Sequence, residues 1–259
     1  MSEKRKVHLD RDPGGLWRLT LDDPEKRNAI GPRMREELLE AAGFLRSSAD
    51  VRCLVVTGAG AAFCAGADLL ALFDGEDASV AELRERQLSY YESFLWLREL
   101  ACPTIAAVNG HAIGAGLNLA LACDIVVAGK DARFGATFSR IGLHPGGGCT
   151  HFMTERMGPG RALRTLLLGA TLCGEDALRA GLADEYADDA LASATALGEH
   201  VASLDARLAA DIKRTVVTAG KGDYETTVVL ESWAQAASAQ RPEVLEGIRR
   251  AGRSTVARS

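Results

Sequence analysis

Hydrophobic residues follow two periods along the chain, one typical of helices and one of buried strands. From residue 28 to 45, the apolar positions Ile30, Met34, Leu38 and Leu45 fall on one helical face, which predicts an amphipathic helix. Short apolar runs predict strands at residues 16–21, 53–57, 104–108 and 124–127. This alternation predicts an α/β fold in which helices cover a parallel sheet.

Beyond about residue 158 the pattern is helical throughout. Helices are predicted at residues 161–168, 175–180, 188–204, 205–219, 223–239 and 242–251. We expect no strand in this region that would continue the sheet. The sequence thus predicts a core over residues 1–195, and a helical region over residues 196–259 that packs on the core or on a neighbouring subunit.

Composition narrows the range of partners. The chain has 259 residues, 47% of them hydrophobic, and a net charge of −5 with its thirty basic residues scattered. These values predict a soluble domain with a small organic ligand, and argue against nucleic acid or an anionic membrane as the main partner. The six cysteines form no CxxC pair, which is typical of reduced, cytoplasmic proteins. No apolar run is long enough for a membrane span, and we expect no metal site.

Two glycine-rich turns are the main candidates for chemistry. The motifs GxSxG, HExxH and GxxxxGK[ST] are absent, and Leu119 stands where a dinucleotide-binding fingerprint requires its third glycine. The turns lie in VVTGAGAAFCAGADL (55–69) and AAVNGHAIGAGLNLALACD (106–124), each after a predicted strand. Backbone N–H groups can approach a ligand closely at such turns, although either turn alone is also an ordinary link between a strand and a helix.

Taken together, the motifs resemble a known family. The chain closely resembles the crotonase, or enoyl-CoA hydratase/isomerase, superfamily. The resemblance lies in FCAGADL, PTIAAVNGHAIGAGLNLALACDIVVAGKDARFG and GLHPGGG, with DDPEKRNAI before them and LCGEDALRAGLADE after them. The resemblance implies the crotonase fold, a spiral of ββα units with two roughly perpendicular sheets and a C-terminal helical trimerisation region. It also implies a homotrimer, or a hexamer built as a dimer of trimers, with residues 196–259 serving oligomerisation and closure of the site.

The family resemblance also implies how a substrate binds. An acyl-CoA thioester would place its carbonyl oxygen between the N–H groups of Ala67 and Ala115, an oxyanion hole for an enolate. No separate cofactor is implied, because coenzyme A is part of the substrate. The residues implied to contact it are Arg27, Ala65, Ala67, Asp68, Leu69 and Gly114. For three of these a plainer interpretation stays open: Arg27 as a solvated charge, Asp68 as a helix cap and Leu69 as a core residue.

The departures from the family pattern concern proton transfer. Hydratases of the family carry two glutamates at positions that here hold Asn118 and Phe138, and neither side chain can take a proton from water. His144, in the following turn, is our candidate for a replacement acid or base, with a structural histidine as the alternative. Cys149 begins a predicted helix, where a thiol pKa can be lowered, but a buried structural cysteine is the favoured interpretation.

Three functions are therefore open. The first is an acyl-CoA enzyme that performs isomerisation, carbon–carbon cleavage, decarboxylation or hydrolysis rather than hydration. The second is an acyl-CoA-binding or carrier protein without catalysis. The third is a weak enoyl-CoA hydratase that depends on ordered water and the oxyanion hole.

Overall fold

The computed structural model describes residues 4–73 and 78–256. The chain divides into two compact units, and the boundary between them lies between residues 203 and 204. The division expected at residues 195 and 196 falls inside α8 (Ala190–Ser203). That helix lies against the sheet, since a Cβ atom on Gly198 would be 2.8 Å from Leu16 Cδ1 and 3.2 Å from Val55 Cγ2. Its close packing explains why all of α8 belongs to the first unit.

Two sheets organise the first unit. One has six strands in the order β1-β2-β3-β5-β7-β10, and the other has four in the order β4-β6-β8-β9. The strands are β1 (Val7–Arg11), β2 (Leu16–Leu21), β3 (Cys53–Gly58), β4 (Ala62–Cys64), β5 (Thr104–Val108), β6 (His111–Ile113), β7 (Ile125–Gly129), β8 (Arg133–Gly135), β9 (Thr171–Cys173) and β10 (Glu185–Ala187). Pairing is parallel except for β1 with β2 and β8 with β9.

Consecutive strands repeat one pattern. In each of the pairs β3/β4, β5/β6 and β7/β8, the first strand joins the six-stranded sheet and the second joins the four-stranded sheet. A helix follows the first two pairs directly, which is the ββα repeat that the family resemblance implied.

The expectation that no strand follows residue 158 was wrong. Strand β10 pairs with β7 in parallel and extends the large sheet, and β9 pairs with β8 at the edge of the small one. Each has only three residues, too few for an alternating or continuous apolar pattern to reveal a strand.

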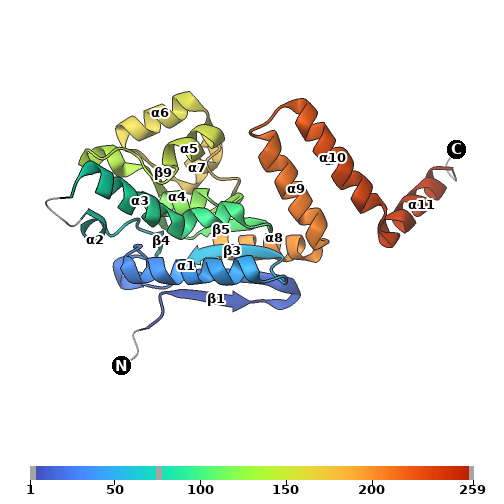
Figure 1. Cartoon of the computed structure of the whole chain (residues 1–259), viewed down its shortest axis with the longest axis horizontal. Helices are drawn as coiled ribbons and strands as arrows, with labels where there is room; N and C mark the ends of the chain where they lie inside the picture. The colour runs from blue at the N-terminus through green and yellow to red at the C-terminus, as the bar shows by residue number, and fades with distance from the viewer. Residues whose placement is uncertain (1–3, 74–77, 257–259) are drawn as a thin grey trace. The chain divides into compact units, whose positions relative to one another are not determined.

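Helices cover both faces of the large sheet. The helices of the first unit are α1 (Pro32–Ser47), α2 (Leu69–Phe73), α3 (Val80–Leu95), α4 (Ala115–Leu121), α5 (Cys149–Met157), α6 (Pro159–Leu168), α7 (Gly174–Ala180) and α8. Buried residues of α1 and α4 share one apolar core with β2 and β3, while α8 closes a second core on the opposite face. Figure 1 shows α1 running alongside β1 and β3.

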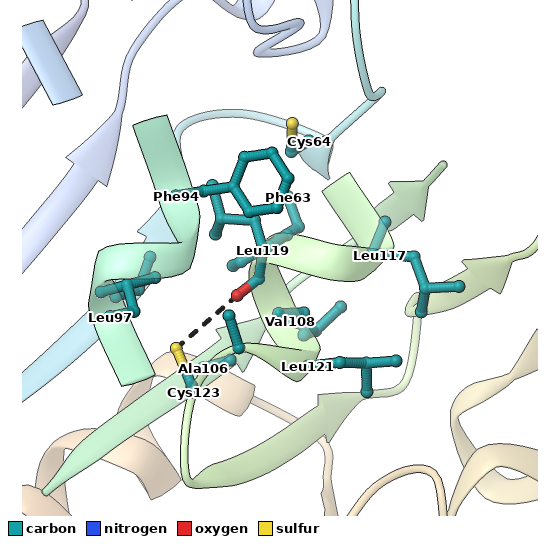
Figure 2. Close-up of a cluster of buried hydrophobic side chains, with 14 of the residues drawn as sticks. Phe63, Cys64, Phe94, Leu97, Ala106, Val108, Leu117, Leu119, Leu121 and Cys123 are labelled. Carbon is teal, nitrogen blue, oxygen red and sulfur yellow. Dashed lines mark hydrogen bonds between the residues drawn. The ribbon is translucent and has the colours of Figure 1, made fainter. Parts of the chain in front are cut away.

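Helix α4 is buried along its whole length. Figure 2 shows its Leu117, Leu119 and Leu121 in one cluster with Phe63 of β4 and Phe94 of α3. The Cys123 thiol, just beyond the helix, donates to the Leu119 carbonyl at 3.8 Å. Because interiors pack densely, this cluster fixes the start of α4, where the second glycine-rich turn lies.

The second unit consists of α9 (Ala206–Ala219), α10 (Tyr224–Ala239) and α11 (Pro242–Val256). These helices confirm the pattern predicted from the sequence. Asp205 and Asp223 accept the N–H groups of Leu208 and Thr226 and so cap the first two helices. Among the described residues, no helix is both long and apolar enough to cross a lipid bilayer.

A buried carboxylate anchors the N-terminal strand. Glu37 of α1 is 1% exposed, and it accepts the N–H groups of Lys6 at 2.7 Å and Val7 at 2.8 Å and the Arg33 Nε–H at 2.6 Å. Burial alone would raise the pKa of Glu37, but the two backbone donors and the guanidinium outweigh it and lower the pKa overall.

We expect E37Q to lower the free energy of unfolding at pH 7 by about 1–3 kcal/mol, because an amide leaves part of this buried donor set unpaired. A carboxyl whose pKa is lowered by folding stabilises the fold above its unfolded pKa of about 4.3, and this contribution is lost as the pH falls through the folded value. The difference from wild type should therefore shrink in acid. Urea unfolding at several pH values measures it, with the exposed Glu40→Gln as the control. An equal loss in both variants would contradict the prediction.

Candidate active site

The first glycine-rich turn is held by the chain segment that precedes α1. The Ala65 N–H donates to the Arg27 carbonyl at 2.9 Å, and the Ile30 N–H donates to the Gly66 carbonyl at 2.8 Å. Gly66 has a φ of +102°, a conformation that favours glycine. Within residues 4–73 and 78–256, no backbone carbonyl accepts the next N–H, that of Ala67.

The second turn leads directly into α4. Gly114 has a φ of +54°, and its N–H donates to the Gly135 carbonyl at 2.9 Å. A Cβ atom on Gly116 would be 2.1 Å from the Cys64 carbonyl oxygen, so only glycine allows α4 to lie so close to β4. The N–H of Ala115, the first residue of α4, also has no backbone acceptor in the described part of the chain.

The two turns contact each other. A Cβ atom on Gly66 would lie 2.6 Å from the Ile113 carbonyl oxygen and 3.4 Å from the Ala115 nitrogen. Ala67 and Ala115 line the same cavity, which has a volume of about 420 Å³. Two backbone donors, without backbone acceptors in the part of the chain that is described, are thus available at the wall of one cavity, where an oxygen atom of a ligand can bind.

Most of the cavity wall is apolar. Its larger apolar side chains come from α2, β6, the short helix η4 (Thr137–Ile141) and the turn after it: Leu69, Leu72, Phe73, Ile113, Phe138, Ile141 and Leu143. Among the described lining residues there is no aspartate or glutamate. The described residues also contain no cluster of three His, Cys, Asp or Glu side chains that could hold a metal ion.

Asn118 lies one helical turn beyond Ala115 and is 1% exposed. Its Nδ2 donates to the Gly146 carbonyl at 2.8 Å, while its Oδ1 is buried with no hydrogen-bond partner in the described structure. Positions three apart share a helical face, so Ala115 and Asn118 face the same region. The free Oδ1 can accept a hydrogen bond from a ligand but cannot act as a base.

Phe138, in η4, and His144, in the turn after η4, form another part of the cavity wall. Phe138 is half-buried, and its ring would be 3.9 Å from a Cβ atom on Gly114, so a phenyl group covers the second turn. His144 is exposed and lines the cavity. Its Nδ1 lies 2.7 Å from the Pro145 carbonyl oxygen, which favours the tautomer with the proton on Nδ1 and leaves the Nε2 lone pair free.

The remaining residues expected to contact coenzyme A belong to the two turns or to the segment before α1. Ala65, Leu69 and Gly114 line the cavity, and Leu69 is 43% exposed, so it is not a core residue. Asp68 accepts the Ala71 N–H at 3.3 Å and so caps α2, as its plainer interpretation predicted. Arg27 is exposed and lines none of the cavities described here.

A smaller cavity of about 210 Å³ adjoins Asp68. Three cationic side chains, those of Lys6, Lys26 and Arg33, line it together with the carboxylates of Asp23 and Asp68. Lys6 pairs with Asp23 at 2.8 Å, and Arg33 pairs with Glu37 at 2.6 Å. The sequence does not reveal this cavity, because isolated basic side chains near the N-terminus have the pattern of ordinary surface residues. Two of the three cations are thus already paired, which leaves Lys26 to meet a phosphate group.

Helix α3 supplies one wall of the 420 Å³ cavity. Gln87, Tyr90 and Tyr91 line the cavity from this helix. A capping box of Ser79 and Glu82 marks its start, and that SxxE signal could have located the helix. Nothing in the sequence, however, indicates which face of α3 meets the glycine-rich turns.

Two cysteines near the site are structural. Burial raises the pKa of the Cys64 thiol to about 12, against a weaker opposing effect of the Gly66 N–H. Burial likewise raises the pKa of Cys149 to about 12, which agrees with the favoured interpretation of that residue. Neither thiol is a nucleophile at neutral pH.

Comparison with known proteins shows the family to which the chain is similar. The family model described as enoyl-CoA hydratase/isomerase matches residues 11–250. A probable enoyl-CoA hydratase, EchA14, of Mycobacterium tuberculosis is 43% identical over 232 residues, which cover 87% of this chain and 89% of the relative. The 1,2-epoxyphenylacetyl-CoA isomerase of Escherichia coli is 33% identical over 237 residues, covering 90% of each chain.

Solved structures give the same result. A putative enoyl-CoA hydratase of Thermobifida fusca in complex with CoA has a TM-score of 0.81 and 34% identity, over 90% of this chain and 93% of that one. An enoyl-CoA hydratase of Bacillus anthracis has a TM-score of 0.86 and 25% identity, over 96% of both chains.

Proposed function

Because the chain belongs to the enoyl-CoA hydratase/isomerase family, we propose that it is an enzyme that stabilises the enolate oxyanion of an acyl-CoA thioester with the N–H groups of Ala67 and Ala115. One observation carries the proposal: two backbone donors without backbone acceptors in the described structure line one mainly apolar cavity. Donors preorganised around a developing charge contribute about 3–4 kcal/mol each to lowering the barrier.

The reaction we propose is isomerisation, carbon–carbon cleavage, decarboxylation or thioester hydrolysis rather than hydration. Adding water across a double bond requires a group that takes a proton from water, and no described residue lining the cavity has a carboxylate. Among the lining side chains, His144 Nε2 is the candidate proton acceptor, and Asn118 Oδ1 is a hydrogen-bond acceptor for a substrate group or a water molecule.

Coenzyme A would bind across the first turn. We propose contacts from Arg27, Ala65, Ala67, Asp68, Leu69 and Gly114. Lys26, in the 210 Å³ cavity beside Asp68, would add a charge-assisted contact to its phosphates. The T. fusca neighbour, crystallised with CoA, supports a ligand of this class.

Two measurements on the purified protein test the proposal. Incubation with a panel of acyl-CoAs, followed by mass spectrometry, detects a product from any of the four reactions. A conjugated thioester such as cinnamoyl-CoA should shift its absorbance to longer wavelength on binding, because two donors on the carbonyl polarise the chromophore. Absence of both product and spectral shift would refute the proposal.

Crotonyl-CoA hydration should be at least about 100-fold slower than for a hydratase of the family that has both glutamates, because general acid–base groups contribute 10²–10⁴-fold. Loss of the enoyl absorbance measures the rate, and a binding titration with the same ester checks that the substrate is bound. Hydration at the rate of the reference hydratase would contradict our interpretation of Asn118 and Phe138.

A catalytically inactive acyl-CoA-binding protein is the second candidate. The lack of a carboxylate among the described lining residues favours it, since the cavity can bind a thioester without moving a proton. Substitution of His144 separates the two functions.

We propose that the chain assembles as a homotrimer or as a dimer of trimers. Leu163, Leu167 and Leu168 of α6 are 58–69% exposed, and large exposed apolar side chains on one helix are typical of protein interfaces. Light scattering would support the proposal with a mass of three or six chains.

A further inference from the structure

Tyr90, a wall residue of the 420 Å³ cavity, has a buried hydroxyl group that is unused. The residue lies on α3, lines the cavity and is only 4% exposed. Its hydroxyl has no hydrogen-bond partner among residues 4–73 and 78–256. Its ring is held edge-on by Phe94 and Tyr91, at centroid distances of 6.0 and 6.3 Å.

The next residue on α3, Tyr91, lines the same cavity, but its hydroxyl is already paired. The Tyr91 hydroxyl donates to Gln87 Oε1 at 3.0 Å, and it accepts the Gly147 N–H. A buried hydroxyl without a partner destabilises the fold, and such groups in native proteins often serve a ligand. Tyr90 is therefore the hydroxyl on this wall that is free to bind a substrate.

The chemistry of Tyr90 indicates what it would bind. Burial raises the pKa of its phenol, with smaller contributions from Cys64 and Tyr91, so the group stays protonated and can donate. The other described lining residues on α2 and α3 are Leu69, Leu72, Phe73, Gln87 and Tyr91, and none carries a charge. The cation of the lining, Arg140, comes from η4 rather than from α2 or α3, so the acceptor matched to the tyrosine hydroxyl itself is a neutral oxygen.

We propose that Tyr90 is a specificity-determining residue that selects acyl groups carrying a neutral oxygen, an oxo or hydroxyl group, over hydrocarbon acyl groups of equal length. This rests on the proposed function, because it requires an acyl-CoA in this cavity. A site built around a hydrogen-bonding group discriminates strongly against an analogue that lacks the partner, since the buried group is left unpaired.

Calorimetric titration with hexanoyl-CoA and its 3-oxo, 4-oxo and 5-oxo derivatives tests the proposal, with mass spectrometry to check that each ester is intact. In wild type, at least one oxo ester should bind about tenfold or more tightly than hexanoyl-CoA, equivalent to about 1.4 kcal/mol. Y90F should remove that gain and leave the affinity for hexanoyl-CoA within about twofold. The matched variant Y91F should keep the preference for the oxo ester, whatever its overall affinity.

The outcomes separate this inference from the proposed function. If hexanoyl-CoA binds but no oxo ester binds more tightly, or if the gain persists in Y90F, the role of Tyr90 is refuted and acyl-CoA binding stands. If neither coenzyme A nor any of the four esters binds, both proposals are refuted. Circular dichroism of Y90F establishes that a lost preference does not come from misfolding.

Discussion

Replacement of Ala115 by proline should lower kcat/KM by about 10²–10³-fold, the effect of removing one oxyanion-hole donor. Proline has no N–H, so the change removes one of the two donors at the cavity wall and adds only a small ring. Coenzyme A itself should bind with nearly unchanged affinity, because it has no thioester carbonyl. Turnover of the best substrate in the acyl-CoA panel and titration with coenzyme A measure the two effects.

The local structure should tolerate this substitution. Ala115 is the first residue of α4, where its N–H makes no intrahelical bond and proline is well accommodated. The preceding residue is Gly114, which has no Cβ atom to clash with a proline ring. Proline therefore removes a donor without breaking the helix.

A matched variant and a spectroscopic measurement make the test decisive. A115G keeps the N–H, so its kcat/KM should fall by less than about tenfold. This decrease is much smaller than the 10²–10³-fold decrease expected for A115P. The spectral shift of bound cinnamoyl-CoA should persist in A115G and largely disappear in A115P. Full activity in A115P would show that the Ala115 N–H does not bind the oxyanion.

The sequence was most informative where long elements carry a clear period. Four elements appear nearly where they were predicted, because each buries a continuous apolar face: the strands at residues 16–21, 53–57 and 104–108 and the helix around Met34. The helix around Ala209 was also predicted, although only its Ala209 and Thr215 are buried. The crotonase fold expected from the glycine-rich motifs is confirmed by the solved structures. The short strands β9 and β10 escaped prediction, because three residues give no measurable alternation.

The candidate site was predictable only in part. Glycine is required in the two turns because there is no room for a side chain: a Cβ atom on Gly116 would be 2.1 Å from the Cys64 carbonyl oxygen. These glycines therefore form a motif that can be recognised in the sequence. Tyr90 leaves no motif. A tyrosine in an amphipathic helix has the same local pattern whether its hydroxyl is paired or not. Only the packing of α3 beside the turns distinguishes it from Tyr91.

Proton transfer is where the two candidate functions differ most. An enzyme that uses His144 should lose turnover by at least about 100-fold in H144A, because a general acid or base contributes 10²–10⁴-fold. Its affinity for an acyl-CoA should change little, since His144 is exposed and its Nδ1 is already engaged by the Pro145 carbonyl. A binding protein, in contrast, has no turnover to lose and should bind equally in both forms.

H144Q adds a further distinction, because glutamine can keep a donor near the Pro145 carbonyl but has no basic nitrogen to replace Nε2. If His144 only positions the turn, H144Q should recover most of the activity that H144A loses. If Nε2 moves the proton, both variants should be equally impaired, and added imidazole should restore part of the rate in H144A. Wild-type turnover in both variants would exclude His144 as the acid or base. The proton would then have to be moved by Tyr90, by a group of the substrate, or by a water molecule bound to Asn118.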